Sequence, residues 1–146
     1  MSDELIDILL VEDSADDAAF VRHALEEAKL GARLRIARDG VEALTLIFGT
    51  VTRDDVTPLM RPKLILLDLK LPKIDGLEVL RRLKSNPHTR ELPVVVLSSS
   101  QEKRDLSDSY RLGVNSYLVK PMDFDEFADS VRIASRYWLE LNQIPK

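Results

Sequence analysis

The chain lacks cysteine altogether and contains only two histidines, His23 and His88. The absence of cysteine excludes disulfide scaffolds, thiol catalysis and cysteine metal sites, and two histidines are too few for a histidine metal cluster. Proteins without disulfides are typical of the reducing cytosol. We therefore expect a cytoplasmic protein.

Long apolar runs and an excess of positive charge are also missing. The longest apolar runs span about six residues, far short of a signal or membrane segment. The 21 basic residues are outnumbered by 25 acidic ones, so the formal net charge of −4 provides no overall positive field for nucleic acid or an anionic membrane. We expect a soluble protein that binds neither nucleic acid nor membranes.

The length of 146 residues, 45% of them hydrophobic, is sufficient for one domain with a core of its own. We expect that domain to span residues 1–146, with a core over about 5–135 and a helical extension over 136–146 that ends at Pro145. Gly49 to Pro62 has neither helical nor strand periodicity and predicts a long surface loop.

Short apolar runs alternate along the chain with segments of helical period. Four runs predict strands that are buried on both faces, and a fifth, with alternating polarity, predicts an edge or less buried strand. The four are Ile6–Val11, Leu64–Leu67, Val94–Leu97 and Asn115–Val119, and the fifth is Arg33–Ala37. The helical segments are Val21–Ala28, Val41–Phe48, Leu77–Leu83, Leu106–Tyr110 and Phe124–Leu141. This order predicts an α/β fold, a doubly wound parallel sheet of five strands with helices on both faces.

Local signals support these helices. Ser14 to Asp17 resembles a capping box, and Asp75-Gly76 predicts a turn and cap before the third helix. In the fifth helix Phe124, Phe127 and Val131 have the spacing of core residues. The basic side chains of the predicted helices are expected to be solvated: Arg81, Arg82, Lys84, Lys103 and Arg104.

Chemically active side chains follow four of the predicted strands. Ligands bind at the carboxyl ends of parallel strands, so these side chains are expected to converge. They are Glu12 and Asp13, then Asp68, then Ser98 and Ser99, then Lys120 and Pro121. Crowded carboxylates repel one another, and a hard divalent cation with oxygen ligands relieves that repulsion, which predicts a Mg²⁺ site. A metal and a lysine beside the Asp68 carboxylate favour phosphoryl transfer to that carboxylate.

Four segments resemble the receiver domains of two-component response regulators: Leu10–Ser14, Leu64–Gly76, Pro93–Ser100 and Gly113–Pro121. The resemblance implies a flavodoxin-like fold with strand order 2-1-3-4-5. It also implies a phosphorelay protein that accepts a phosphoryl group from a histidine kinase and switches a protein-interaction surface. Such a protein catalyses its own phosphorylation and dephosphorylation, but it is a signalling protein rather than an enzyme with a separate substrate.

By the same resemblance, individual residues take roles. Asp68 is the phosphoacceptor, which becomes 4-aspartylphosphate, and Lys120 and Ser98 contact the phosphoryl group. The Mg²⁺ ligands are Glu12, Asp13, Asp68 and the backbone carbonyl of Lys70. The switch residues are Ser98, Tyr117, whose ring rotates, and Pro121, which follows a cis bond. The long loop, the absence of an output domain and the tail Tyr137–Pro145 further resemble small regulators paired with phytochrome-type histidine kinases.

Three alternatives share parts of this pattern. A flavodoxin-like electron carrier has the same expected fold, but the acidic turn Glu12–Asp17 would repel a flavin phosphate. A magnesium-dependent phosphatase or hydrolase needs a general acid near the acceptor, and Leu69–Pro72 offers none. The third, a receiver-shaped scaffold that no longer accepts phosphate, is opposed by the intact set of site residues.

We also expect a homodimer formed by the fourth helix, the fifth strand, the fifth helix and the tail. The tail carries four large apolar residues that need cover, either from a partner subunit or from their own domain: Tyr137, Trp138, Leu141 and Ile144. Nearby charged residues are expected to form a polar rim: Arg104, Asp105, Asp108, Arg111 and Asp125.

Overall fold

The structure, a computed structural model, describes residues 6–50, 55–121 and 123–145. Its strands are β1 (Ile8–Val11), β2 (Leu34–Ala37), β3 (Leu64–Leu67), β4 (Val94–Ser98) and β5 (Ser116–Val119). Its helices are α1 (Ala15–Glu27), α2 (Gly40–Phe48), α3 (Gly76–Ser85), α4 (Lys103–Arg111) and α5 (Phe124–Arg136). A wider helical turn, η1 (Tyr137–Leu141), continues α5.

The strands form one parallel sheet in the order β2-β1-β3-β4-β5, which confirms the predicted fold. Val11 at the end of β1 pairs in register with Ala37 and with Leu67, so β1, β2 and β3 end at the same level. Ser98 at the end of β4 pairs with Val119 at the end of β5. The residues that follow these strands therefore emerge at one edge of the sheet.

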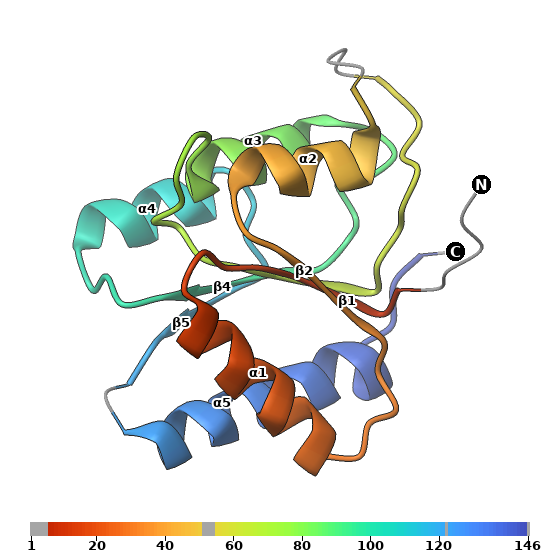
Figure 1. Cartoon of the computed structure of the whole chain (residues 1–146). Coiled ribbons are helices and arrows are strands. Elements are labelled where there is room, and N and C mark those ends of the chain that lie inside the picture. The colour runs from red at the N-terminus through yellow and green to blue at the C-terminus, as the bar shows by residue number, and fades with distance from the viewer. Residues whose placement is uncertain (1–5, 51–54, 122, 146) are drawn as a thin grey trace.

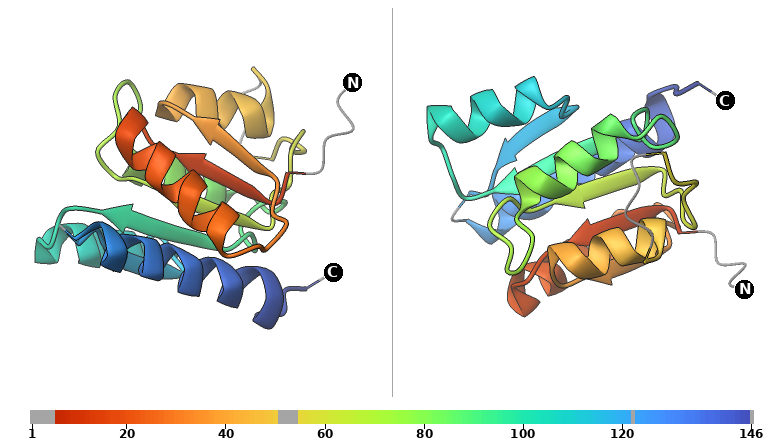
Figure 2. Two further views of the ribbon diagram at one scale, coloured as in Figure 1. Left: turned by 60° about the horizontal axis from the view of Figure 1, so that its bottom comes forward. Right: turned by 90° about the horizontal axis from the view of Figure 1, so that it is seen from above.

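Helices cover both faces of the sheet, as Figure 1 shows. α2, α3 and α4 lie on one side, while α1 and α5 lie side by side on the other (Figures 1 and 2). Alternate residues of β1 divide accordingly, with Leu9 and Val11 in one apolar cluster and Ile8 and Leu10 in the other. Burial of both faces explains why the central strands are continuous apolar runs.

β5 differs from its prediction. All four of its residues are only partly buried, whereas we expected a strand buried on both faces. The reason is its place at the edge of the sheet, where among the described residues only β4 pairs with it. β2 occupies the opposite edge and is partly buried, as its alternating sequence predicted.

Four helices begin at a side chain that accepts a backbone hydrogen bond from the first turn. These N-cap residues are Ser14, Asp39, Asp75 and Asp123. The predicted caps at Ser14 and Asp75 are thus confirmed. Gly76 starts α3 so close to β3 that a Cβ atom there would overlap the backbone carbonyl oxygen of Asp68, which fixes where the chain after Asp68 runs.

The segment before β3 is partly internal. Residues 51–54 of the predicted loop lie outside the described residues. Within the remainder Val56 is buried, and its carbonyl oxygen accepts a hydrogen bond of 2.9 Å from Asn86 Nδ2. The expectation of a loop confined to the surface is therefore wrong for Val56, because its apolar side chain joins the core beside α2 and α3.

Lys84 is also not the solvated side chain that we expected. Its Nζ donates to the carbonyl oxygens of Arg90 and Leu92 and to Asn115 Oδ1, at 3.0, 2.9 and 2.9 Å. Burial lowers the pKa of Lys84 to about 8. The prediction failed because the segment before β4 and the start of β5 close over the end of α3.

The C-terminal segment partly covers its own domain. Trp138 and Leu139 pack against the cluster between the sheet, α1 and α5, while Tyr137, Leu141 and Ile144 stay exposed. The helical part ends at Leu141, not near Pro145 as predicted, since Asn142 already has an extended backbone.

Phe124 was wrongly assigned to the core. It is exposed and stacks on Phe20 of α1, with ring centroids 4.3 Å apart. Phe127 and Val131 are buried as predicted. In the described part of the chain no helix is long and apolar enough to cross a membrane.

Candidate functional site

Three carboxylates meet where β1 and β3 end. Glu12, Asp13 and Asp68 each offer an oxygen atom, and these atoms all lie within 4.8 Å of one another. Glu12 and Asp68 are buried, with 3% and 7% of their surface exposed, whereas Asp13 is exposed. The sequence prediction that these side chains converge agrees with this geometry.

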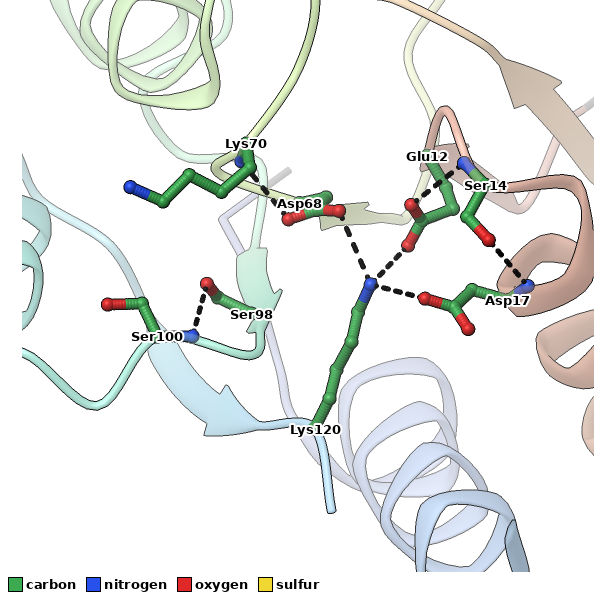
Figure 3. A network of polar contacts seen from close by, with 8 residues as sticks. All are labelled: Glu12, Ser14, Asp17, Asp68, Lys70, Ser98, Ser100 and Lys120. Carbon is green, nitrogen blue, oxygen red and sulfur yellow. Dashed lines mark hydrogen bonds and ion pairs between the residues drawn. The ribbon is translucent and has the colours of Figure 1, made fainter. Parts of the chain in front are cut away.

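Lys120 enters the same space from the end of β5 (Figure 3). Its Nζ lies 2.6 Å from Glu12 Oε1, 2.8 Å from Asp17 Oδ2 and 3.3 Å from Asp68 Oδ2. The Lys120 backbone is held by a hydrogen bond of 2.8 Å from its N–H to the carbonyl oxygen of Ser98. The expected ammonium partner of Asp68 is therefore in place, and it joins the ends of β1, β3 and β5.

Burial and charge set the protonation of this group. Burial raises the pKa of Glu12 to about 7, with a further rise from the charge of Asp68, although the hydrogen bond from Lys120 works in the opposite direction. Burial by itself would lower the pKa of Lys120, but the hydrogen bonds to Asp17 and Glu12 and the charge of Asp68 outweigh it and raise the pKa. Lys120 is thus a firmly charged ammonium at neutral pH.

Asp17 is a member of the site that the sequence reasoning missed. We interpreted Ser14 to Asp17 as a cap, and the Ser14 hydroxyl does accept from the Asp17 N–H at 3.2 Å. The reciprocal part of a capping box is absent, because the Ser14 N–H donates instead to Glu12 Oε2. The Asp17 carboxylate is therefore free to reach Lys120. The acidic turn Asp16-Asp17 carried a signal, but sequence alone does not say toward which cation it points.

Ser98, Ser100 and Tyr117 form a second cluster beside Asp68. Ser98 is fully buried at the end of β4, and its Oγ accepts a hydrogen bond of 3.1 Å from the Ser100 N–H. The Tyr117 hydroxyl donates to the Ser100 carbonyl oxygen at 3.0 Å. The Ser100 hydroxyl donates to Asp105 of α4. One residue, Ser100, thus contacts two of the three predicted switch residues and the next helix.

Asp105 consequently departs from its predicted place in a polar rim. It is buried and also lies 3.8 Å from Lys70 Nζ, so it links α4 to the segment after β3. The other proposed rim residues of α4 pair within the helix, since Asp108 lies 3.9 Å from Arg104 and 3.2 Å from Arg111.

Lys70 and Pro121 were assigned by resemblance alone. The Lys70 N–H donates to Asp68 Oδ1 at 3.1 Å, which fixes the carboxylate on the side away from Lys120 (Figure 3). The expected cis bond before Pro121 is wrong for this structure, because no peptide bond between described residues is cis. The trans isomer is the more stable form of such a bond by about 0.5–1 kcal/mol.

The residues present fit a hard divalent cation. All the side-chain donors are carboxylate oxygens, which Mg²⁺ and Mn²⁺ prefer over nitrogen or sulfur. Lys120 contributes one positive charge where four carboxylates gather, counting Asp17, so the group carries an excess of negative charge. Asp13 is exposed, so one side of the group is in contact with solvent.

Comparison with known proteins agrees with this geometry. Residues 8–132 match the response regulator receiver domain. The chain is 40% identical over 138 residues to response regulator Rcp1 of Synechocystis sp., covering 94% of this chain and 92% of that protein. The crystal structure of the Mn²⁺-bound form of response regulator Rcp1 is similar with a TM-score of 0.84 and 39% identity, covering 97% of this chain and 99% of that one.

A second solved structure, the phosphorylated cyanobacterial phytochrome response regulator RcpA, has a TM-score of 0.84 and 34% identity, covering 98% of this chain and all (100%) of that one. The flavodoxin-like electron carrier and the phosphatase are not favoured by any of these matches. The chain therefore belongs to the response regulator receiver domain family and is a phosphorelay signalling protein.

Proposed function

We propose that Asp68 accepts a phosphoryl group from a histidine kinase in a Mg²⁺-dependent reaction. The observation that carries the proposal is the position of the Asp68 carboxylate. It is buried at the end of β3, one oxygen lies 3.3 Å from Lys120 Nζ, and Glu12 and Asp13 lie beside it. A carboxylate in such a place needs cations, and those cations also stabilise an added phosphoryl group.

The step is a displacement at phosphorus. A carboxylate oxygen of Asp68 forms the new P–O bond while the P–N bond of the phosphohistidine breaks, and the electron pair of that bond goes to the imidazole nitrogen of the kinase. The product is an acyl phosphate on Asp68. Its phosphoryl group has three oxygens that are not bonded to the carboxyl carbon, and these contact the surrounding site. Lys120 then pairs with one of them, and the Ser98 hydroxyl donates to another.

Glu12, Asp13, Asp68 and the Lys70 carbonyl would hold the Mg²⁺. When bound, the ion neutralises charge on the phosphoryl oxygens. The support is the shared cluster of carboxylate oxygens in this chain, together with the Mn²⁺ of the similar Rcp1 structure.

The output switch uses Ser98, Tyr117 and the segment between β4 and α4. When the Ser98 side chain rotates so that its hydroxyl donates to a phosphoryl oxygen, Oγ moves away from the Ser100 N–H, and the hydrogen bond between them is lost. Ser100 also receives the Tyr117 hydroxyl, so a shift of Ser100 changes the place of the ring. Pro121 follows Lys120, and its ring restricts the backbone directly after this residue.

The donor kinase is of the phytochrome type. This rests on the similarity along nearly the whole chain to a cyanobacterial phytochrome response regulator and to the bacteriophytochrome response regulator RtBRR, which is 42% identical. The long loop before β3 and the apolar tail of this chain also support a kinase of this type.

The regulator is a homodimer formed by α4, β5, α5 and the tail. β5 is a half-exposed edge strand, and the tail presents Tyr137, Leu141 and Ile144 to solvent even though Trp138 is covered. Sedimentation equilibrium on a Tyr137→Ser/Leu141→Ser variant tests the surface, with Leu59→Ser as a control because Leu59 is equally apolar and exposed elsewhere. We expect the first variant to dissociate and the control to remain a dimer, and a monomeric wild type would contradict the dimer.

The phosphoacceptor is tested by incubation with acetyl phosphate and Mg²⁺ followed by mass spectrometry of the intact protein. Wild type and the surface control Asp125→Asn should gain one phosphoryl group, whereas Asp68→Asn should gain none. Removal of Mg²⁺ with a chelator should have the same effect as Asp68→Asn. Stoichiometric labelling of Asp68→Asn would show that another residue is the acceptor.

A further inference from the structure

Lys120 has three carboxylate partners that differ in origin and environment. Glu12 and Asp68 follow two central strands, and their side chains are 2% and 9% exposed. Asp17 lies in the first turn of α1, and its side chain is 34% exposed. Despite this exposure its oxygen lies 2.8 Å from the ammonium, closer than the 3.3 Å of Asp68.

Two of these partners are needed elsewhere. Glu12 and Asp68 belong to the group of carboxylates that suits a divalent cation, together with Asp13. Asp17 is not part of that group among the described residues. A cation and the Lys120 ammonium therefore compete for the same two carboxylates, and they also repel each other. Lys120 is only 11% exposed at its side chain, so water cannot replace an anionic partner for it.

Asp17 belongs to the first turn of α1, whereas the proposed metal ligands follow the strands β1 and β3. Its N–H is held by the Ser14 hydroxyl at the start of α1, and among the described residues its carboxylate is not a member of the group formed by Glu12, Asp13 and Asp68. When a cation occupies Glu12 and Asp68, Asp17 is the one of the three partners that Lys120 keeps. In Figure 3 the Asp17 carboxylate approaches the ammonium from α1, in a different direction from Asp68, and Glu12 lies between the two.

We infer that Asp17 is a positioning residue that holds Lys120 while Mg²⁺ occupies the other carboxylates, and from which Lys120 passes to the phosphoryl oxygen. This inference rests on the proposed function, and it adds a residue to which no role in the phosphoryl transfer had been given. Asp17 acts through Lys120 and does not bind the ion itself. Its loss should therefore strengthen the competition of Lys120 with Mg²⁺.

The test is a double-mutant cycle on Mg²⁺ affinity. The affinity of each variant of the whole chain is measured from the amide chemical shifts in a Mg²⁺ titration. In Asp17→Asn we expect the affinity to fall about three- to fivefold, near the upper end of what one partly exposed ion pair contributes. In a Lys120→Met background, the same Asp17→Asn change should alter the affinity by no more than about twofold. Asp17→Glu, which keeps the carboxylate, should restore an affinity close to that of wild type.

Asp16→Asn is the matched control, since Asp16 is the exposed carboxylate next in sequence and its loss changes the net charge equally. It should have less than about a twofold effect if distance from Lys120 matters more than total charge. An equal loss of affinity from Asp17→Asn with and without Lys120 would overturn the inference, because Asp17 would then act on the ion directly. An unchanged affinity in Asp17→Asn would overturn it as well.

The same titration separates this inference from the proposed function. Absence of any saturable Mg²⁺ response in wild type would refute the metal site and the role of Asp17 together. A Lys120→Met protein without a dispersed amide spectrum would not be folded. In that case Asp17→Asn, Asp17→Glu and Asp16→Asn are compared in the wild-type background. Equal Mg²⁺ affinities of these three variants would contradict the inference.

Discussion

The hydroxyl of Tyr117 donates a hydrogen bond of 3.0 Å to the backbone carbonyl oxygen of Ser100. In the sequence, Ser100 precedes α4, in the segment after β4, and Tyr117 follows α4, in β5. Because the Ser100 N–H also donates to the buried Ser98 hydroxyl, this contact connects the β5 edge of the sheet with the candidate phosphoryl site.

Removal of the Tyr117 hydroxyl should loosen this connection without emptying the core. We expect Tyr117→Phe to lower the free energy of unfolding by about 0.5–1.5 kcal/mol, the usual net value of one hydrogen bond. The exposed Tyr110 of α4 provides the control, and Tyr110→Phe should change stability by less than about 0.5 kcal/mol. Urea unfolding measures both, and equal effects of the two variants would show that the Ser100 contact contributes nothing.

The structure predicts that Lys84 contributes to stability, although it looks like a surface residue in the sequence. Lys84→Met keeps the apolar stem but leaves the Arg90 and Leu92 carbonyl oxygens without the ammonium donor, so we expect a loss of about 1–3 kcal/mol. Lys103→Met at the exposed start of α4 is the control. A Lys84→Met protein as stable as wild type in urea would contradict the prediction.

A side chain at Gly76 should disturb the acceptor through the backbone. The added Cβ of Gly76→Ala would overlap the Asp68 carbonyl oxygen and lie 2.5 Å from Leu69 Cα, so α3 or the end of β3 must shift. We expect a loss of about 2 kcal/mol or more in stability and slower phosphorylation from acetyl phosphate. Ser85→Ala at the opposite end of α3 should do neither, and normal phosphorylation of a folded Gly76→Ala protein would refute the close approach.

Glu12 should make stability depend on pH when Mg²⁺ is removed by a chelator. Burial raises its pKa from 4.5 in the unfolded chain to about 7 in the folded protein. Between these values the folded state holds a proton that the unfolded state has lost, so the free energy of unfolding should fall as pH rises from about 4.5 to about 7. Below 4.5 both states are protonated, and the full contribution is present.

Glu12→Gln should remove that decline, which amounts to at most about 3 kcal/mol for this group. Glu26→Gln changes an exposed carboxylate of α1 and serves as the control. Denaturant unfolding at several pH values without Mg²⁺ measures the slope. A wild-type slope identical to that of Glu12→Gln would contradict the raised pKa.

Some features of the site were accessible from local patterns. Asp68 follows four apolar residues, and Glu12 and Asp13 follow another apolar run, so their positions at strand ends could be predicted without coordinates. The same logic placed Ser98 and Lys120. Parallel topology brings such ends to one edge, which is why convergence followed from the order of the elements.

Other features depended on contacts between distant segments. From the sequence we expected Lys84 to be solvated and Phe124 to lie in the core, and both predictions were wrong. A helical period does not tell which neighbouring segment packs against the end of a helix. Asp105 was assigned to a surface rim for the same reason, although Ser100 and Lys70 lie against it.

By itself, therefore, the sequence determined the α/β architecture, the strand that carries each reactive side chain and the acidic, cysteine-free character of the site, because hydrophobic period and residue type are local properties. Only the tertiary structure decided which partners those side chains choose. Lys120 and Asp17 are 103 positions apart in the sequence, and Tyr117 and Ser100 are 17 apart. Such pairs form hydrogen bonds only because the fold places helix ends and strand ends together in space.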